Sequence, residues 1–171
     1  RKICHKTATA KNYVDNKELV CMLYCDYYYE QEPQNILVVA DDADEAQGYI
    51  LCALDYKVFF ENFHKLYIPK VKKLSRTEAL IHQIEPLFYK NIARDYPAHL
   101  HIDLLPVCQG QGLGTKLINT LCDNLKNMGV KGISLSVGSG NVGAIKFYEK
   151  LGFEKLKSIF GKAYVYGKKL G

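Results

Sequence analysis

A run of glycines between an expected strand and an expected helix is the first feature of this sequence that could do chemistry. The run reads Gln109-Gly110-Gln111-Gly112-Leu113-Gly114 and joins an alternating apolar segment to an amphipathic one. The first amides of a helix have no intrahelical acceptors, and the helix dipole favours negative charge at that end. Glycines also let the backbone approach a phosphate closely. The loop therefore predicts an anion site, and the alternative is a simple turn from strand to helix.

Two common phosphate-binding loops do not fit this spacing. A Walker loop needs Gly-Lys followed by Ser or Thr, whereas the sequence here reads Gly114-Thr115-Lys116. The dinucleotide fingerprint needs a third glycine, which would fall on Thr115 or Leu117. The residues thus argue against a nucleotide phosphotransferase and against that dinucleotide site.

A second motif further along the chain gives the glycine loop a context. The first motif reads P-x-x-Q-G-x-G-x-G from Pro106 to Gly114, and the second reads N-x-x-A-x-x-F-Y-E-K-L-G-F from Asn141 to Phe153. In this order the pair resembles the GNAT superfamily of acyl-CoA-dependent N-acetyltransferases. The segment from Tyr96 to Pro106 resembles, more narrowly, a branch related to the acetyltransferase-like C-terminal domain of O-GlcNAcases.

The resemblance implies that acetyl-CoA binds here and that its acetyl group passes directly to an amine in a ternary complex. It implies that the loop amides bind the pyrophosphate, that the strand end pairs with the pantetheine arm like an added strand, and that an N–H near Leu104 polarises the thioester carbonyl. Asn141 contacts the arm or caps its own helix. The cofactor-binding residues implied are Leu104, Leu105, Gln109, Gly110, Gln111, Gly112, Leu113, Gly114, Thr115, Asn141, Ala144, Phe147 and Tyr148.

Three residues are the candidate catalytic groups. The resemblance implies that Tyr148 protonates the leaving thiolate, and the alternative for this residue is a core aromatic. Asp103 and His101 share one face of an expected strand, and either could be the base. Asp103 would need a pKa raised by burial, His101 needs less tuning, and a water-relayed base or plain local hydrogen bonding are the alternatives.

A metal site is not expected. His99 lies on the same strand face as His101 and Asp103, which invites such a reading. However, side chains four residues apart on one strand are separated by about 13 Å, so the three cannot reach one ion.

Alternating β and α patterns predict an α/β fold of three layers with a mixed, mostly antiparallel sheet. Strands are expected at 35–40, 47–54, 98–105, 133–137, 153–160 and 163–169, and helices at 113–128 and 141–151. The chain opens with the end of a helix, and the capping box Asp15–Glu18 predicts a helix to about Tyr29. The segment Tyr56–Lys90 predicts inserted helical pieces interrupted at Pro69 and Pro86. GNAT chains usually open with a strand before the first helix, whereas this chain opens with a helix. The first family strand is therefore expected to be absent.

Composition places these elements in one soluble domain, residues 1–171. Apolar residues make up 48% of the 171 and no run is long enough to span a membrane. The net charge of +5 is scattered, which argues against nucleic acid as a partner. The six cysteines form no C-x-x-C pair, which indicates free thiols in a reducing cytoplasm. A monomer or a homodimer is expected.

The sequence leaves four classes of acceptor amine open, namely a small amine, an aminoglycoside, a peptide N-terminus and a lysine side chain. By position, Tyr56–Lys90 and Tyr27–Tyr29 are expected to shape its cleft. The rival to an enzyme is a non-catalytic acyl-CoA-binding or interaction module of the same fold.

Overall fold

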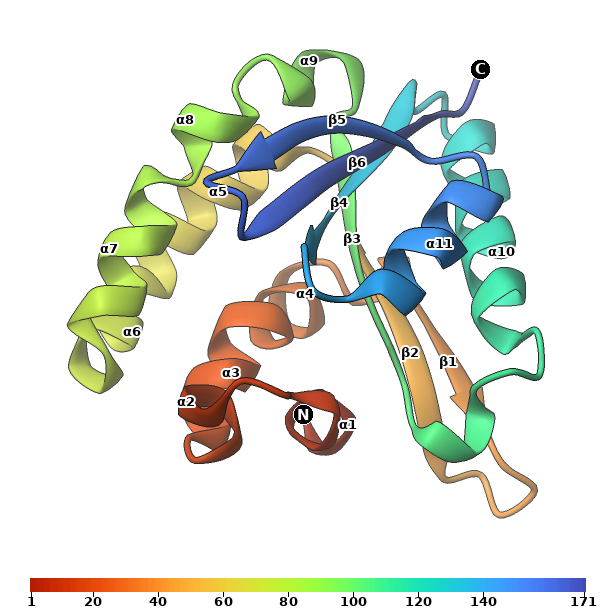
Figure 1. The fold of residues 1–171 in the computed structure, drawn as a ribbon, viewed down its shortest axis with the longest axis horizontal. Helices are drawn as coiled ribbons and strands as arrows, with labels where there is room; N and C mark the ends of the chain where they lie inside the picture. Colours follow the sequence, from red (N-terminus) through yellow and green to blue (C-terminus); the bar gives the residue numbers. More distant parts are fainter.

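A six-stranded sheet in the order β1-β2-β3-β4-β6-β5 forms the middle layer of the molecule (Figure 1). The computed structural model describes residues 1–171, except for the side chain of Asn12. The strands are β1 Ile36–Ala40, β2 Ala46–Ala53, β3 Ala98–Leu104, β4 Gly132–Gly138, β5 Glu154–Ile159 and β6 Ala163–Lys169. Only the β3–β4 pair is parallel, so the sheet is mixed and mostly antiparallel as predicted.

The α-helices fall into three groups along the chain (Figure 1). Those before the sheet are α1 Lys2–Thr7, α2 Lys11–Val14, α3 Lys17–Tyr24 and α4 Asp26–Gln31. Those inserted between β2 and β3 are α5 Tyr56–Leu66, α6 Ile68–Leu74, α7 Arg76–Ile84, α8 Pro86–Tyr89 and α9 Ile92–Asp95. The last two are α10 Leu113–Asn127 and α11 Val142–Lys150. Among the described residues, no helix is both long and apolar enough to cross a membrane.

Strand periodicity explains the three layers. On β2, Tyr49, Leu51 and Ala53 pack with the helices that precede the sheet and with α5–α7. The alternate residues Ile50 and Cys52 pack with α10 and α11 on the other face. Because successive side chains of a strand point to opposite faces, one eight-residue strand contributes to both apolar cores.

The parallel pairing between β3 and β4 is short. It covers only Ala98↔Ile133 and His99↔Ser134, although both strands continue for several residues. Figure 1 shows β3 and β4 diverging beyond this point. The edges of the two strands are therefore unpaired with each other from Leu100 and Leu135 onward, which opens the middle of the sheet.

Two local predictions about the N-terminal helices were wrong. The helix cap is Asn16 and not Asp15, because the Asn16 backbone is non-helical and its Oδ1 accepts from Leu19 N at 3.0 Å. The expected helix to Tyr29 is also two helices, α3 and α4, broken at Cys25, whose φ of −132° is outside the helical range.

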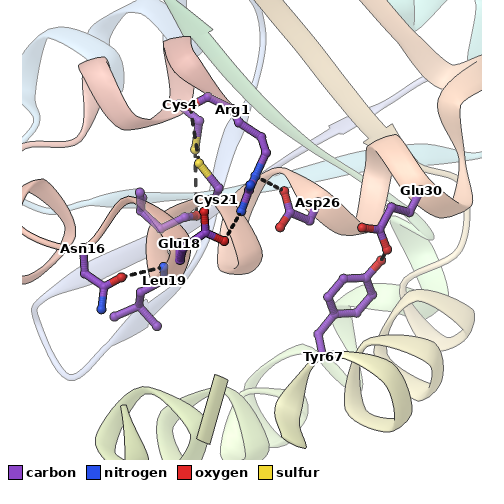
Figure 2. A network of polar contacts seen from close by, with 10 residues as sticks. Arg1, Cys4, Asn16, Glu18, Leu19, Cys21, Asp26, Glu30 and Tyr67 are labelled. Atoms are coloured by element: carbon purple, nitrogen blue, oxygen red, sulfur yellow. Dashed lines mark hydrogen bonds and ion pairs between the residues drawn. The ribbon is translucent and has the colours of Figure 1, made fainter. Parts of the chain in front are cut away.

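Polar contacts tie these N-terminal helices together (Figure 2). Arg1 Nη2 contacts Glu18 Oε2 at 2.7 Å, and Arg1 Nε contacts Asp26 Oδ1 at 2.9 Å. Tyr67 OH, between α5 and α6, donates to Glu30 Oε2 at 2.7 Å. The contacts link α1 with α3 and α4, and α4 with the inserted helices, so they fix the elements that wall the cavity described below.

Candidate active site

The glycine loop presents unpaired amides at the start of α10. Gly110 and Gly112 have φ values of 75° and 77°, which a side chain would strain. In the described part of the chain, no other residue accepts from the amides of Leu113, Gly114 or Thr115. No acidic side chain lies in the first turn of α10. The unpaired amide donors, the dipole of α10 and the lack of a competing carboxylate in its first turn together fit an anionic ligand such as a pyrophosphate.

The end of β3 faces the opening in the sheet. Leu105 N donates to Gln47 O at 2.9 Å, and Leu105 O accepts from Cys108 N at 2.9 Å, so both groups have partners within the chain. Along an antiparallel pair, residues alternate between those whose backbone groups bond to the partner strand and those whose groups point away from it. The N–H and C=O of Leu104 therefore point away from β2, toward the opening. Gln109 Nε2 donates to Leu104 O at 2.9 Å and ties the loop to the strand. Leu104, and not Leu105, therefore offers a free N–H beside the opening.

Gly114 lets three elements meet at the loop. A Cβ at this position would lie 3.2 Å from Leu104 Cδ1 and 3.2 Å from Phe147 Cζ. The absent side chain thus allows α10 to approach β3 and α11 closely. Asn141 caps α11, since its Oδ1 accepts from Ala144 N at 3.1 Å. Gln111 remains in the loop, where its Nε2 donates to Val107 O at 2.7 Å.

Tyr148 lies on α11 with its ring in the core. The residue is 8% exposed and its ring contacts Phe147 and Phe153. Burial, and then the nearby Asp103 charge, raise the pKa of Tyr148 well above its ordinary value. The phenol is therefore protonated at neutral pH.

His101 and Asp103 form a hydrogen-bonded pair on β3. His101 Nε2 and Asp103 Oδ2 are 3.1 Å apart, and Tyr49 OH donates to the same carboxylate. The His101 ring stacks on Tyr24, with ring centroids 5.5 Å apart and 24° between planes. When Nε2–H donates to Asp103, the neutral ring keeps Nδ1 as an acceptor.

Asp103 does not have the raised pKa that it would need to act as the base. Burial does act in that direction, but the hydrogen bonds from His101, Tyr49 and Thr7 and the His101 charge outweigh it. The pKa of Asp103 is lowered, so the group stays an anion and is a poor base. Its position instead favours holding and orienting the His101 ring.

Cys4 of α1 is the third group of this cluster. Its sulfur and the ligand atoms of His101 and Asp103 all lie within 4.8 Å of one another. Such a set can bind Zn²⁺ when the thiol is ionised. Here burial raises the pKa of Cys4 far above its usual value, and the other two groups are already paired with each other. The absence of a resident metal stays a prediction.

His99 is placed apart from the pair, as its strand position required. Its Nε2 is 2.8 Å from Tyr28 OH, on α4. Burial, helped by the His101 charge, lowers the pKa of His99 to about 3. The ring is therefore neutral in the folded protein.

We expect this buried ring to make folding acid-sensitive. His99 binds a proton near pH 6.5 when unfolded and near 3 when folded, so stability falls as pH drops through that window. Between pH 6.5 and 5 the loss of unfolding free energy is about 1–2 kcal/mol. Urea unfolding at both pH values measures this loss of unfolding free energy. Between the same two pH values, the His99→Gln variant should lose less unfolding free energy than the wild type, and the difference should be about the loss given above. Equal losses in the two proteins would contradict the prediction.

A cavity of about 90 Å³ lies where β3 and β4 separate. Leu100, His101, Leu135 and Ser136 line its strand side, and residues of α3, α4, α5, α7 and α8, most of them aromatic, line the rest together with Glu85. Residues of Tyr56–Lys90 and Tyr28 thus meet here, whereas Tyr27 packs elsewhere, against Phe59 and Tyr67. Sequence reasoning missed the contributions of Tyr24 and of β4, for which the chain carries no local signal.

Comparison with known proteins decides the family. A model of the acetyltransferase (GNAT) family matches residues 7–153. The chain belongs to the acetyltransferase (GNAT) family. An uncharacterized N-acetyltransferase of Methanocaldococcus jannaschii is 40% identical over 72 residues, which cover 42% of this chain and 32% of that protein. The chain spans about a third of the length of the curated relatives it matches.

Solved structures agree on the GNAT fold. The crystal structure of a protein named SsHAT has a TM-score of 0.84 and 28% identity, and covers 99% of this chain and 91% of its own. A GNAT phosphinothricin acetyltransferase from Sinorhizobium meliloti, solved with acetyl-CoA, has a TM-score of 0.54 and 16% identity; the match covers 84% of this chain and 66% of that one. The predicted fold and acetyltransferase family are therefore confirmed, and the helices α5–α9 occupy the expected insertion.

Proposed function

We propose that residues 1–171 are one acetyltransferase domain that transfers the acetyl group of acetyl-CoA directly to a primary amine. The observation that carries the proposal is the opening between β3 and β4, because the Leu104 N–H points toward it and His101 lines its cavity. Unpaired amides follow Leu104 in the loop, and the Asp103 charge reaches Tyr148. The Tyr96–Pro106 segment further supports a place in the branch related to O-GlcNAcase acetyltransferase-like domains. Six free, buried cysteines suit a reducing cytoplasm.

The loop and strand end hold the co-substrate. Bound acetyl-CoA supplies an acetyl group activated as a thioester. The amides of residues 112–115 bind its pyrophosphate, and Leu104 pairs with its pantetheine arm as a neighbouring strand would. Leu104 N–H donates to the oxyanion that develops on the carbonyl, an interaction typically worth about 3 kcal/mol.

His101 and Tyr148 move the protons. His101 Nδ1 takes a proton from the incoming ammonium, and the Asp103 carboxylate stabilises the resulting imidazolium. The amine nitrogen then bonds to the carbonyl carbon as the carbon–sulfur bond breaks. Tyr148 OH gives its proton to the leaving sulfur, and the second proton of the amine returns to Tyr148. In total, one ammonium group and one thioester are converted into one amide, one free thiol and one released proton.

The proposal is tested by binding and turnover together. Acetyl-CoA and desulfo-CoA should both raise the melting temperature, and acetyl-CoA with a mixture of primary amines should release free thiol. Stabilisation by both ligands without thiol release on any amine would favour the non-catalytic module instead.

Replacing the phenol of Tyr148 should separate chemistry from binding. Tyr148→Phe keeps the buried ring and removes the acid, so we expect kcat to fall roughly a hundredfold. The Kd for acetyl-CoA, measured by calorimetry, should change less than twofold. Tyr164→Phe, on β6, is the matched control and should keep full kcat. An unchanged kcat in Tyr148→Phe would remove this residue from the mechanism.

A further inference from the structure

The cavity beside the β3–β4 opening has walls suited to a cation. Seven Tyr and Phe rings line it, and neither Lys nor Arg is among the residues that form its wall. Ring faces attract ammonium groups, more strongly where water is excluded. Tyr56 and Tyr89 stack with centroids 4.6 Å apart, and Phe59 lies 4.3 Å from the His99 ring, so the wall is closely packed.

One carboxylate gives this wall a negative charge. Glu85 is the acidic residue in the lining, and its Oε2 is 2.9 Å from His82 Nδ1. Burial raises the pKa values of Tyr56 and Tyr89, and the charge of Glu85 is the next contribution to both. The field of Glu85 therefore reaches both of these rings in the cavity wall.

Two buried polar atoms in the wall have no hydrogen-bond partner among the residues that the structure describes. They are Tyr56 OH and His99 Nδ1, on residues that are 5% and 9% exposed. Leaving such groups unpaired is costly, so native proteins seldom do it without a ligand or water to meet them. Both residues line the cavity, so the two atoms mark a place for a hydrogen-bonding guest.

We propose that this cavity binds the acceptor and selects an ammonium group at the end of an unbranched alkyl chain, of the kind found on a lysine side chain. The proposal rests on the proposed function, because it takes the cavity as the acceptor side of the same site. A volume of about 90 Å³ is smaller than the engineered cavity of about 150 Å³ that holds benzene. A slender aminoalkyl group fits such a space and can bring its nitrogen between the closely packed rings, whereas a carbon branch next to the nitrogen would clash with them.

The test measures binding without chemistry. CoA has no acetyl group to transfer, so calorimetry on the CoA-bound protein reports the cavity alone. We expect n-pentylamine to bind at least tenfold tighter than 2-aminopentane, which has the same atoms but is branched. It should also bind at least tenfold tighter than 1-pentanol, which lacks the charge.

Variants then assign the selectivity to Glu85. Glu85→Gln should weaken n-pentylamine binding about tenfold and leave 1-pentanol unchanged, whereas Glu61→Gln, on the exposed side of α5, should change neither. Equal affinities for the branched and unbranched amines, or equal effects of the two variants, would overturn the inference.

Turnover measured separately keeps the two proposals distinguishable. Selective binding of n-pentylamine without acetyl transfer would reject the proposed function and support the cavity assignment. Acetyl transfer to 2-aminopentane at the same rate as to n-pentylamine would support the proposed function and reject the cavity assignment.

Discussion

His101→Ala should lower kcat/KM for the acceptor amine roughly a thousandfold while acetyl-CoA still binds, because a positioned base contributes about 10²–10⁴-fold. His101 lines the cavity, and Asp103 holds its Nε2 at 3.1 Å, which leaves Nδ1 to meet the amine. Asp103 cannot replace it, since hydrogen bonds lower the pKa of that carboxyl. Thiol release at saturating acetyl-CoA, with calorimetry for the Kd of acetyl-CoA, measures both quantities.

The pH profile distinguishes a missing base from a damaged cavity. Without His101 the amine must arrive already neutral, so the residual rate should rise tenfold per pH unit until the amine itself loses its proton. The matched control is His64→Ala, because His64 lies on α5 beside Phe60 but is not part of the cavity lining. A low rate with the wild-type pH profile would mean that His101 only shapes the cavity.

The hydrogen-bonded pair of His101 and Asp103 illustrates what a sequence can predict. Alternation along Ala98–Leu104 placed His101 and Asp103 on one face, because a strand has a period of two residues. The pKa of Asp103 could not be predicted in the same way. Tyr49 comes from β2 and Thr7 from α1, and their hydrogen bonds to Asp103 depend on strand register and helix packing.

The cavity and the break in the helices beside it also could not be predicted from the sequence, because both depend on long-range geometry. The glycine loop and Tyr148 were legible because their motifs are local, but the opening exists only because β3 and β4 stop pairing after His99 and Ser134. The break at Cys25 was missed since Leu19, Leu23 and Tyr27 keep helical spacing across it, and all three are buried. Periodicity reports burial, and it does not report where a helix changes direction.

The anion site makes a prediction in which stability and affinity change in opposite directions. Thr115→Glu puts a carboxylate in the first turn of α10, where the helix dipole favours negative charge by about 0.3–1 kcal/mol. The same charge repels a pyrophosphate bound to the amides of residues 112–115. We therefore expect the Kd for acetyl-CoA to rise ten- to a hundredfold while the melting temperature of the free protein holds or increases.

The control is the same substitution further along the helix. Thr120→Glu adds one negative charge at an exposed position of α10, more than a turn beyond the amides, and should change the Kd less than twofold. Raising the salt concentration should narrow the difference between the two variants, because screening weakens the repulsion and leaves a steric effect untouched. A Kd that Thr115→Glu leaves unchanged would place the pyrophosphate away from the start of α10. Weaker binding accompanied by a lower melting temperature would instead mean that the side chain disrupts the loop, and the sign of the stability change separates these two results.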